Sequence, residues 1–392
     1  MTQTFAMLVD AYRELNSRKL FWVSLGLSVL VVLAFGALGV SETGFSILWW
    51  DFRHRFINTN LLPPEFFYKF LFFSFGIKFW LAWLASILAL ISTAGIIPDF
   101  VSGGSVELSL SKPIGRLRLF LTKYATGLLF ATLQVAVFSL AAFILIGVRG
   151  KSWEPGLFLA VPIVVCFFSY LYALCALVGL VTRSTIAALL TTLLFWFLLF
   201  AVNVTDGLFV QQRERAVLQR ESLVGRIERA ERGTGAQLEK TERDRLLAAG
   251  ETPPEADPSA PRPAAELDAA NPILAMYRTR LVEAEKDSKT WAYWARVIMI
   301  AKTVLPKTAE TVQLLERRLI SGEEMDRFVR AVDDRPSRIG EDDDVPIDNR
   351  EVQRRAVAAL KTRPIWWVLG TSLAFEALVL GIASWIFCRR DF

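Results

Sequence analysis

The feature that most constrains this chain is a set of six long stretches that are apolar and almost free of charge. A helix needs about 20 apolar residues to cross the ~30 Å hydrocarbon core of a bilayer, because its backbone groups must be paired within the segment. Five stretches contain no Asp, Glu, Lys or Arg, and the sixth contains only Glu376. They are residues 20–40, 79–97, 124–148, 157–181, 184–204 and 364–388. The sequence therefore predicts an all-α polytopic membrane protein with six transmembrane helices.

Composition agrees with this prediction. Hydrophobic residues make up 53% of the 392 residues, and charged residues, 21% of the chain, are concentrated in one region. That region, residues 205–363, is a hydrophilic insertion between the fifth and sixth stretches, with 28 basic and 29 acidic residues. Such an uneven distribution excludes a single globular enzyme domain, and the near-neutral balance argues against a nucleic-acid partner.

The positive charges indicate an orientation. An even number of spans places both termini on one side, and the short loops on that side carry ten Lys and Arg residues against six on the other. Because cytoplasmic loops are enriched in Lys and Arg, we expect a multi-pass protein of the cell membrane with both termini in the cytoplasm. The insertion 205–363 is then extracytoplasmic.

Within the insertion, the pattern predicts mainly helices. Residues 209–250 are rich in Arg and Glu with sparse apolar positions, which is typical of a long solvated helix or a short coiled coil. Residues 251–272 hold six prolines and are predicted to be a linker without secondary structure. Further helices are predicted over residues 273–305 and 311–332.

Three further segments carry functional hypotheses. Residues 1–19 place apolar side chains at a spacing of three to four, which predicts an amphipathic helix in the inner interface, in contact with lipid. Lys78 and Glu376 are the ionisable groups in or beside spans, and they are candidates to pair with each other. Alternatively, the Lys78 side chain extends to the outer interface. For Glu376, the alternatives are a role in function or in subunit contact, or no such role.

The loop between the second and third spans, within residues 98–123, is the most informative segment. Pro98 ends the span, Gly103 and Gly104 allow a tight turn, and Lys112 and Arg116 hold the end of the loop in the cytosol. Residues 106–110 alternate apolar with polar side chains, and so short an element cannot bury an apolar face alone. The loop is therefore predicted to dock a soluble partner; the alternative is a polar loop with no partner.

These residues resemble the cytoplasmic loop of type-2 ABC exporter permeases. The features that carry the resemblance are Asp99, Gly103 or Gly104, the run Glu107-Leu-Ser-Leu-Ser-Lys112-Pro113, Arg116 and Lys123. The last residues, Phe387-Cys-Arg-Arg-Asp-Phe392, are similar to the aromatic-basic-basic-Asp-Phe ending of that family. Two departures are that Asp99 stands where Glu is more usual, and that the insertion is far larger than the family's short hairpin.

The resemblance implies a permease subunit that works as a homodimer or with a similar permease. It further implies that the loop is a coupling helix held by an ATPase subunit, present in two copies. No cofactor is expected on this chain, because the phosphate-binding pattern GxxxxGK[ST] is not met: before Gly150-Lys151-Ser152, Leu145 occupies the place of the first glycine.

Two other classes of function are compatible with a membrane protein. One is a non-transport membrane scaffold or sensor whose insertion binds an extracytoplasmic partner. The other, a membrane-embedded enzyme, is disfavoured because the sequence offers no Cys or His metal motif and no grouping of Ser, His and carboxylates. We therefore expect no enzymatic activity of the chain's own. The sequence does not indicate the transported substrate.

Overall fold

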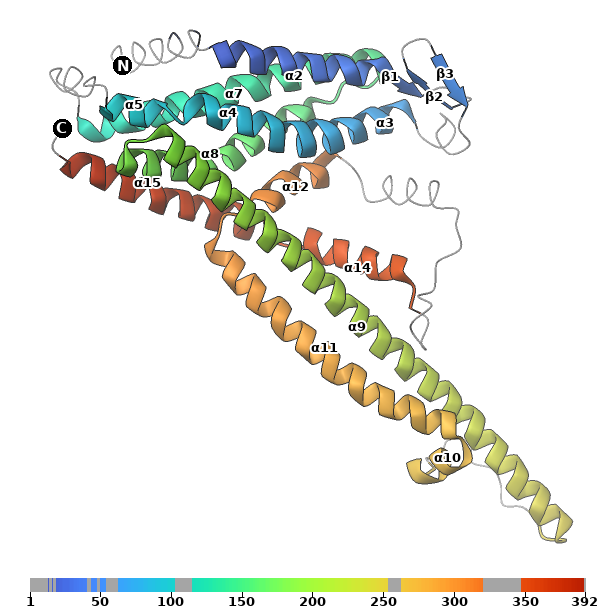
Figure 1. Cartoon of the computed structure of the whole chain (residues 1–392). Coiled ribbons are helices and arrows are strands. Elements are labelled where there is room, and N and C mark those ends of the chain that lie inside the picture. The colour runs from blue at the N-terminus through green and yellow to red at the C-terminus, as the bar shows by residue number, and fades with distance from the viewer. Residues whose placement is uncertain are drawn as a thin grey trace. The chain divides into compact units, whose positions relative to one another are not determined.

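The computed structural model describes residues 13, 16, 19–40, 44–47, 50–53, 63–102, 115–252, 262–319 and 347–390. These residues are mostly helical, and they form two units (Figure 1). Unit 1 comprises residues 1–203, 301–334 and 363–392, and unit 2 comprises residues 204–300 and 335–362. The predicted amphipathic helix of residues 1–19 lies almost entirely outside the described residues.

Six helical segments of the described chain are long and apolar enough to cross a membrane. This confirms the prediction of several long apolar helices. The segments are α2 (Lys19–Ala37), the run Pro64–Ser102, α7 (Arg116–Arg149), the run Pro155–Thr182, α9 (Thr185–Ala248) and the run Trp366–Arg389. Three of the runs join several elements: α3 (Pro64–Leu71), η1 (Phe72–Ala85), α4 (Ser86–Thr93) and α5 (Ile96–Ser102); η2 (Pro155–Leu159) and α8 (Ala160–Thr182); η3 (Trp366–Gly370) and α15 (Thr371–Arg389).

The second segment starts earlier than predicted, at Pro64 rather than at residue 79. Charged residues between these positions had interrupted the apolar pattern. The structure compensates one of them, because the Lys69 ammonium lies 2.5 Å from a carboxylate oxygen of Glu65 and 2.7 Å from one of Glu154. The helix therefore continues through a position that a hydropathy criterion excludes.

Residues 38–53 contain a small antiparallel sheet, so the all-α prediction is wrong here. Its order is β1 (Leu38–Val40), β2 (Gly44–Ile47), β3 (Trp50–Arg53), with Gly39 opposite Ser46. The apolar pattern assigns β1 to the end of the first span, because a three-residue apolar strand that follows an apolar helix has no pattern of its own.

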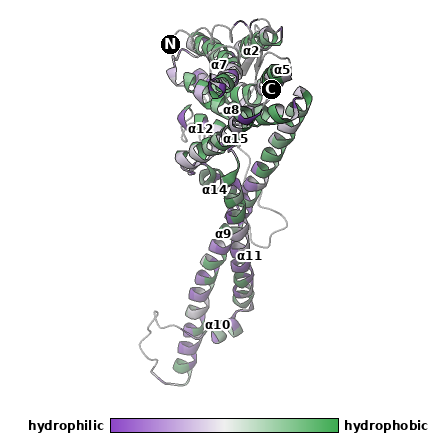
Figure 2. Cartoon of the chain, turned by 90° about the vertical axis from the view of Figure 1, so that its left-hand side faces the viewer, coloured by the Kyte–Doolittle hydropathy of each residue, from purple (hydrophilic) through white to green (hydrophobic). Residues whose placement is uncertain are grey.

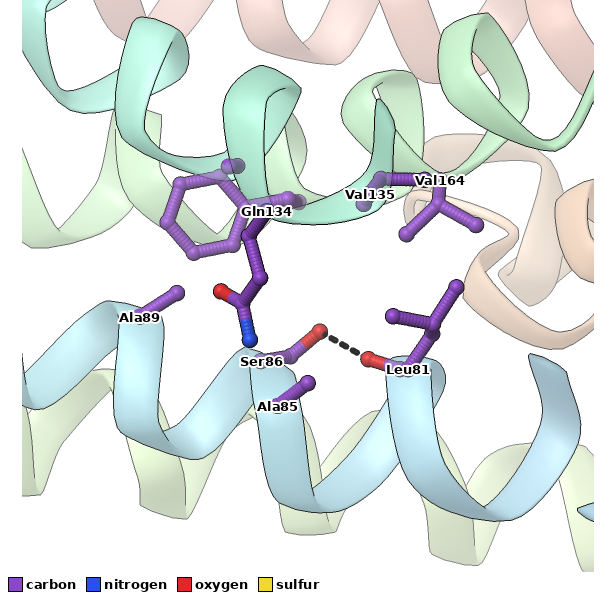
Figure 3. A pocket seen from close by; sticks show the side chains of 9 residues that line it. Leu81, Ala85, Ser86, Ala89, Gln134, Val135 and Val164 are labelled. Atoms are coloured by element: carbon purple, nitrogen blue, oxygen red, sulfur yellow. Dashed lines mark hydrogen bonds between the residues drawn. The ribbon is translucent and has the colours of Figure 1, made fainter. Parts of the chain in front are cut away.

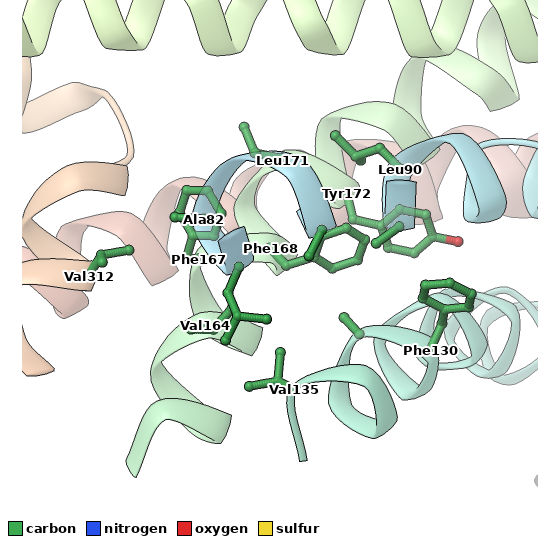
Figure 4. Close-up of a cluster of buried hydrophobic side chains, with 14 of the residues drawn as sticks. Ala82, Leu90, Phe130, Val135, Val164, Phe167, Phe168, Leu171, Tyr172 and Val312 are labelled. Atoms are coloured by element: carbon green, nitrogen blue, oxygen red, sulfur yellow. The ribbon is translucent and has the colours of Figure 1, made fainter. Parts of the chain in front are cut away.

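The core of unit 1 lies between α7, α8 and the α4 region. Figure 4 shows Phe130 and Val135 of α7 facing Val164, Phe168 and Tyr172 of α8. Close approach depends on Gly127, since a Cβ atom there would lie 2.3 Å from the Tyr172 ring. Helix α12 (Thr308–Leu319), at the start of the helix predicted over 311–332, packs against α8 and belongs to unit 1.

Unit 2 consists mainly of α9 beyond residue 203 and α11 (Pro272–Val304). Helices predicted over 209–250 and 273–305 are thus present, but the first is an unbroken continuation of the fifth apolar segment. Figure 2 shows α9 changing from a mainly hydrophobic to a mixed surface along its length. Leu223 packs with Ala284, and Ile227 packs with Leu274.

Two short helices of unit 2 were not predicted. Helix α10 (Ala264–Ala270) lies inside the proline-rich stretch, where Pro263 precedes its first turn and Leu267 is buried in the α9–α11 contact. The prediction of a linker without secondary structure is therefore wrong at these residues. Helix α14 (Asn349–Lys361) begins at Asp348, whose carboxylate accepts a hydrogen bond of 2.9 Å from the Arg350 amide.

Candidate functional site

At one end of unit 1, four helices meet: α5, the start of α7, and the ends of α8 and α15. Helix α5 follows a turn at residues 94–95, and it packs against the end of α8. At this contact a Cβ atom on Gly179 would lie 2.9 Å from Pro98. Asp99 is exposed on α5, and a Cβ atom on Gly95 would lie 2.7 Å from its carboxylate. Two glycines therefore set the position of the segment that carries Asp99.

Two arginines tie the neighbouring helix ends together. The Arg116 guanidinium, at the start of α7, donates hydrogen bonds to the carbonyls of Cys388 (3.2 Å) and Arg390 (3.0 Å). The Arg390 guanidinium donates to the carbonyl of Leu180 at 2.7 Å. Because the last carbonyls of a helix have no partner within it and carry partial negative charge, cations satisfy them well.

Aromatic side chains fill the space beneath these arginines. Phe387 is completely buried, with its ring centre 6.4 Å from that of Phe100 and 5.5 Å from that of Phe120. The Lys123 ammonium lies 5.3 Å from the Phe100 ring centre. Arg116 of the loop motif and Arg390 of the chain end, 274 positions apart, thus belong to one packed cluster with α5.

Five of the candidate residues lie outside the described residues. These are Gly103, Gly104, Glu107, Lys112 and Pro113. Their assignment to a coupling helix stays a prediction. The helices that flank that segment, α5 with Asp99 and α7 with Arg116, pack against each other.

Glu376 lies half-buried on α15, facing α7 and α8. One carboxylate oxygen accepts a hydrogen bond of 2.9 Å from the Tyr124 hydroxyl, and the other accepts one of 2.8 Å from the Ser169 hydroxyl. The Tyr124 ring stacks on Tyr172, with 5.2 Å between ring centres. A carboxylate in an apolar environment is costly unless it is hydrogen-bonded, and here two neutral donors meet that need.

Lys78 has a different partner from the one proposed. Its ammonium lies 3.0 Å from a carboxylate oxygen of Glu316 on α12 and 4.5 Å from the Phe73 ring centre. The hypothesis that Lys78 pairs with Glu376 is therefore wrong. Glu316 lies 238 positions away, in the further helix predicted over residues 311–332, so no local pattern indicated the pair.

A buried ionic cluster on the α12 side of unit 1 was missed altogether. Glu310 of α12 forms ion pairs with Lys302 at the end of α11 and with Arg363, whose guanidinium lies 2.9 Å from the shared oxygen. The one sequence signal is that Lys302 is the only charge in the apolar run 297–305. Lys307, in the turn between α11 and α12, is also buried, and this burial lowers the pKa of its ammonium to about 8.

A small cavity lies between α4, α7 and α8 (Figure 3). Its volume is about 10 Å³, which is room for about one water molecule rather than for a metabolite. Gln134 is 2% exposed and points its amide toward Ser86, whose hydroxyl donates to the Leu81 carbonyl at 2.7 Å. Within the described chain, the Gln134 amide nitrogen has no hydrogen-bond partner.

Two other candidate sites concern phosphate binding and metal binding. Helix α7 ends at Arg149, and Lys151 follows with φ of 54°, so Gly150-Lys151-Ser152 lies in a loop. In the part of the chain that the structure describes, no three His, Cys, Asp or Glu side chains are placed to hold a metal ion. The three cysteines are free thiols.

Comparison of the chain with known protein families, with curated proteins and with solved structures gives no match.

Proposed function

We propose that the chain is the transmembrane subunit of an ATP-driven exporter of the ABC type. In this proposal separate ATPase subunits hydrolyse ATP, and the chain moves a substrate across the cell membrane. The observation that carries the proposal is the cluster of α5, the start of α7 and the end of α15. It joins the flanks of the loop motif to the C-terminal arginine motif.

The mechanism we propose is a shift between two packings of the apolar helices. A partner that grips residues 103–114 pulls on α5 and α7, which frame that segment. Because Arg116 bonds the end of α15, and Arg390 bonds the end of α8, the displacement reaches four helices together. A partner can shift the equilibrium only by the difference in its contacts with the two packings.

Two ATPase copies and a second permease copy complete this assembly. Both termini are then cytoplasmic, and unit 2 is extracytoplasmic. A protease-accessible tag at Glu255 tests the orientation independently: we expect cleavage from the outside only. Cleavage of the tag from the cytoplasmic side alone would refute the orientation and with it the docking of a cytosolic ATPase.

Co-purification tests the function directly. We expect a soluble nucleotide-hydrolysing subunit to purify with the wild-type chain and to be lost from the variant Glu107→Arg. The matched control is Glu283→Arg, since Glu283 is exposed on α11 in unit 2. If the ATPase purifies with both variants, the proposed coupling segment is wrong.

A second candidate function is a membrane scaffold that binds an extracytoplasmic partner. It is favoured by the size of unit 2, in which α9 and α11 are 64 and 33 residues long. Purification of an envelope partner that depends on residues 204–300, with no ATPase from the same membranes, would support the scaffold over the exporter.

A further inference from the structure

Three passages of the chain between the two units lie next to one ionic cluster. The chain leaves unit 1 after Asn203, returns at residue 301 and returns again at Arg363. Lys302 lies one residue past the second of these passages. The remaining passage, between residues 334 and 335, is outside the described residues.

Glu310 is the centre of this cluster. One of its carboxylate oxygens contacts both the Lys302 ammonium and the Arg363 guanidinium. Lys302 also donates a hydrogen bond of 2.7 Å to the side-chain oxygen of Asn203. Lys302, Glu310 and Arg363 are 4%, 3% and 8% exposed. The cluster, defined as Asn203, Lys302, Glu310 and Arg363, thus ties α9, α11, α12 and the approach to α15.

A second layer of contacts orients the cluster. The Arg363 guanidinium lies 5.5 Å from the ring centre of Trp367, whose indole nitrogen donates to the Thr303 hydroxyl at 3.2 Å. The Arg317 guanidinium donates to the Arg363 carbonyl at 2.8 Å. The Lys307 amide donates to the Ser372 hydroxyl at 2.9 Å. These bonds connect both ends of the α11–α12 turn to the first turns of the last helix.

Stability alone does not explain buried charges at this place. Removing ions from water costs several kcal/mol each, and replacing a buried ion pair by apolar side chains is often neutral or stabilising. The Glu310 carboxylate is, however, bonded by Lys302 and by Arg363, and Lys302 is in turn bonded to Asn203. Directional bonds of this kind specify a single arrangement of the segments that they join. If apolar side chains replaced these charges, the segments would no longer be held in that single arrangement.

We propose that the cluster is a joint, with Glu310 as its positioning residue. The joint holds α9 at Asn203, the end of α11 and the approach to the last helix as one body. Helices α9 and α11 run without a break from unit 1 into unit 2. A displacement of either helix is therefore delivered to α15, the helix that carries Glu376. This inference depends neither on the transported substrate nor on an ATPase.

The joint is tested by a distance measurement on the full chain in lipid nanodiscs. Spin labels are placed at Val304 and Leu373, which are 73% and 44% exposed, after replacement of the three native cysteines. We expect one narrow distance distribution with the joint intact. In Glu310→Gln, which keeps the side-chain shape but loses the charge, the distribution should widen at least twofold.

A second variant and a control separate this effect from general unfolding. The variant Lys302→Met/Glu310→Leu/Arg363→Met leaves no unpaired charge of the cluster, so its melting temperature should stay close to that of the wild type while the distribution widens. Glu283→Gln, on the exposed part of α11, should leave the width unchanged. An unchanged width in both joint variants overturns the proposal, as does equal widening in the control.

Discussion

The two ends of unit 1 use positive charge in different ways. At the end formed by α5, α7, α8 and α15, Arg116 and Arg390 donate to backbone carbonyls. At the other end, Lys69, Lys78 and Lys302 form ion pairs with carboxylates. A backbone carbonyl is present whichever side chain its residue carries, whereas a side-chain carboxylate is lost by one mutation. The second end is therefore the more sensitive to single changes in its acidic residues.

The largest effect expected from this comparison is that of Glu310→Ala. The variant leaves Lys302 and Arg363 buried without their shared carboxylate, and we expect the free energy of unfolding to fall by about 3–5 kcal/mol. Denaturant unfolding in detergent micelles measures this loss. A loss below about 1 kcal/mol, the range of exposed ion pairs, would remove the distinction between the two ends.

The pH dependence of stability sharpens the comparison at the same end. Burial lowers the pKa of Lys307 from 10.5 to about 8, while nearby Glu310 opposes that shift. Between pH 8 and 10.5 the unfolded chain binds more protons at this residue than the native chain does. The free energy of unfolding should therefore rise with pH across this window, by at most about 1.4 kcal/mol per pH unit for one proton.

Lys307→Met supplies the control for the pH measurement. Because methionine has no titrating group, the difference in unfolding free energy between variant and wild type should follow the same pH window. Parallel curves for the two proteins would show that Lys307 does not titrate with folding.

The smallest effect is expected at the opposite end, for Arg390→Ala. The variant removes one charge-assisted hydrogen bond to the Leu180 carbonyl but leaves no buried charge without a partner, so we expect a loss of about 1.5–3 kcal/mol. Thermal unfolding of both variants under one condition compares the ends. A loss as large as that of Glu310→Ala would contradict the comparison.

The sequence was most informative where a pattern is local. Charge-free runs predict the long apolar helices, because hydropathy is a property of consecutive residues. The helix start at Pro64 was missed because the compensation of Lys69 involves Glu154, 85 positions away. The cluster around Glu310 has no local pattern for the same reason, since its other members, Asn203, Lys302 and Arg363, lie on three separate segments.

In the candidate site, the sequence predicted only the residues that flank the loop segment 103–114. Asp99 and Arg116 were selected from the motif, and the structure places their segments in one cluster with Phe387. The partner of Glu376 was not predictable. Tyr124 and Ser169 are neutral residues of apolar helices, and nothing in their spacing distinguishes them from residues that only pack.

The unbroken course of α9 has a mechanical consequence. From residue 204 to Ala248 this helix extends for about 67 Å at 1.5 Å per residue. A rigid rod of that length amplifies small rotations at its root: a tilt of 5° moves the far tip by about 6 Å, roughly one helical pitch. Conversely, a modest push on the tip acts on the root with a long moment arm.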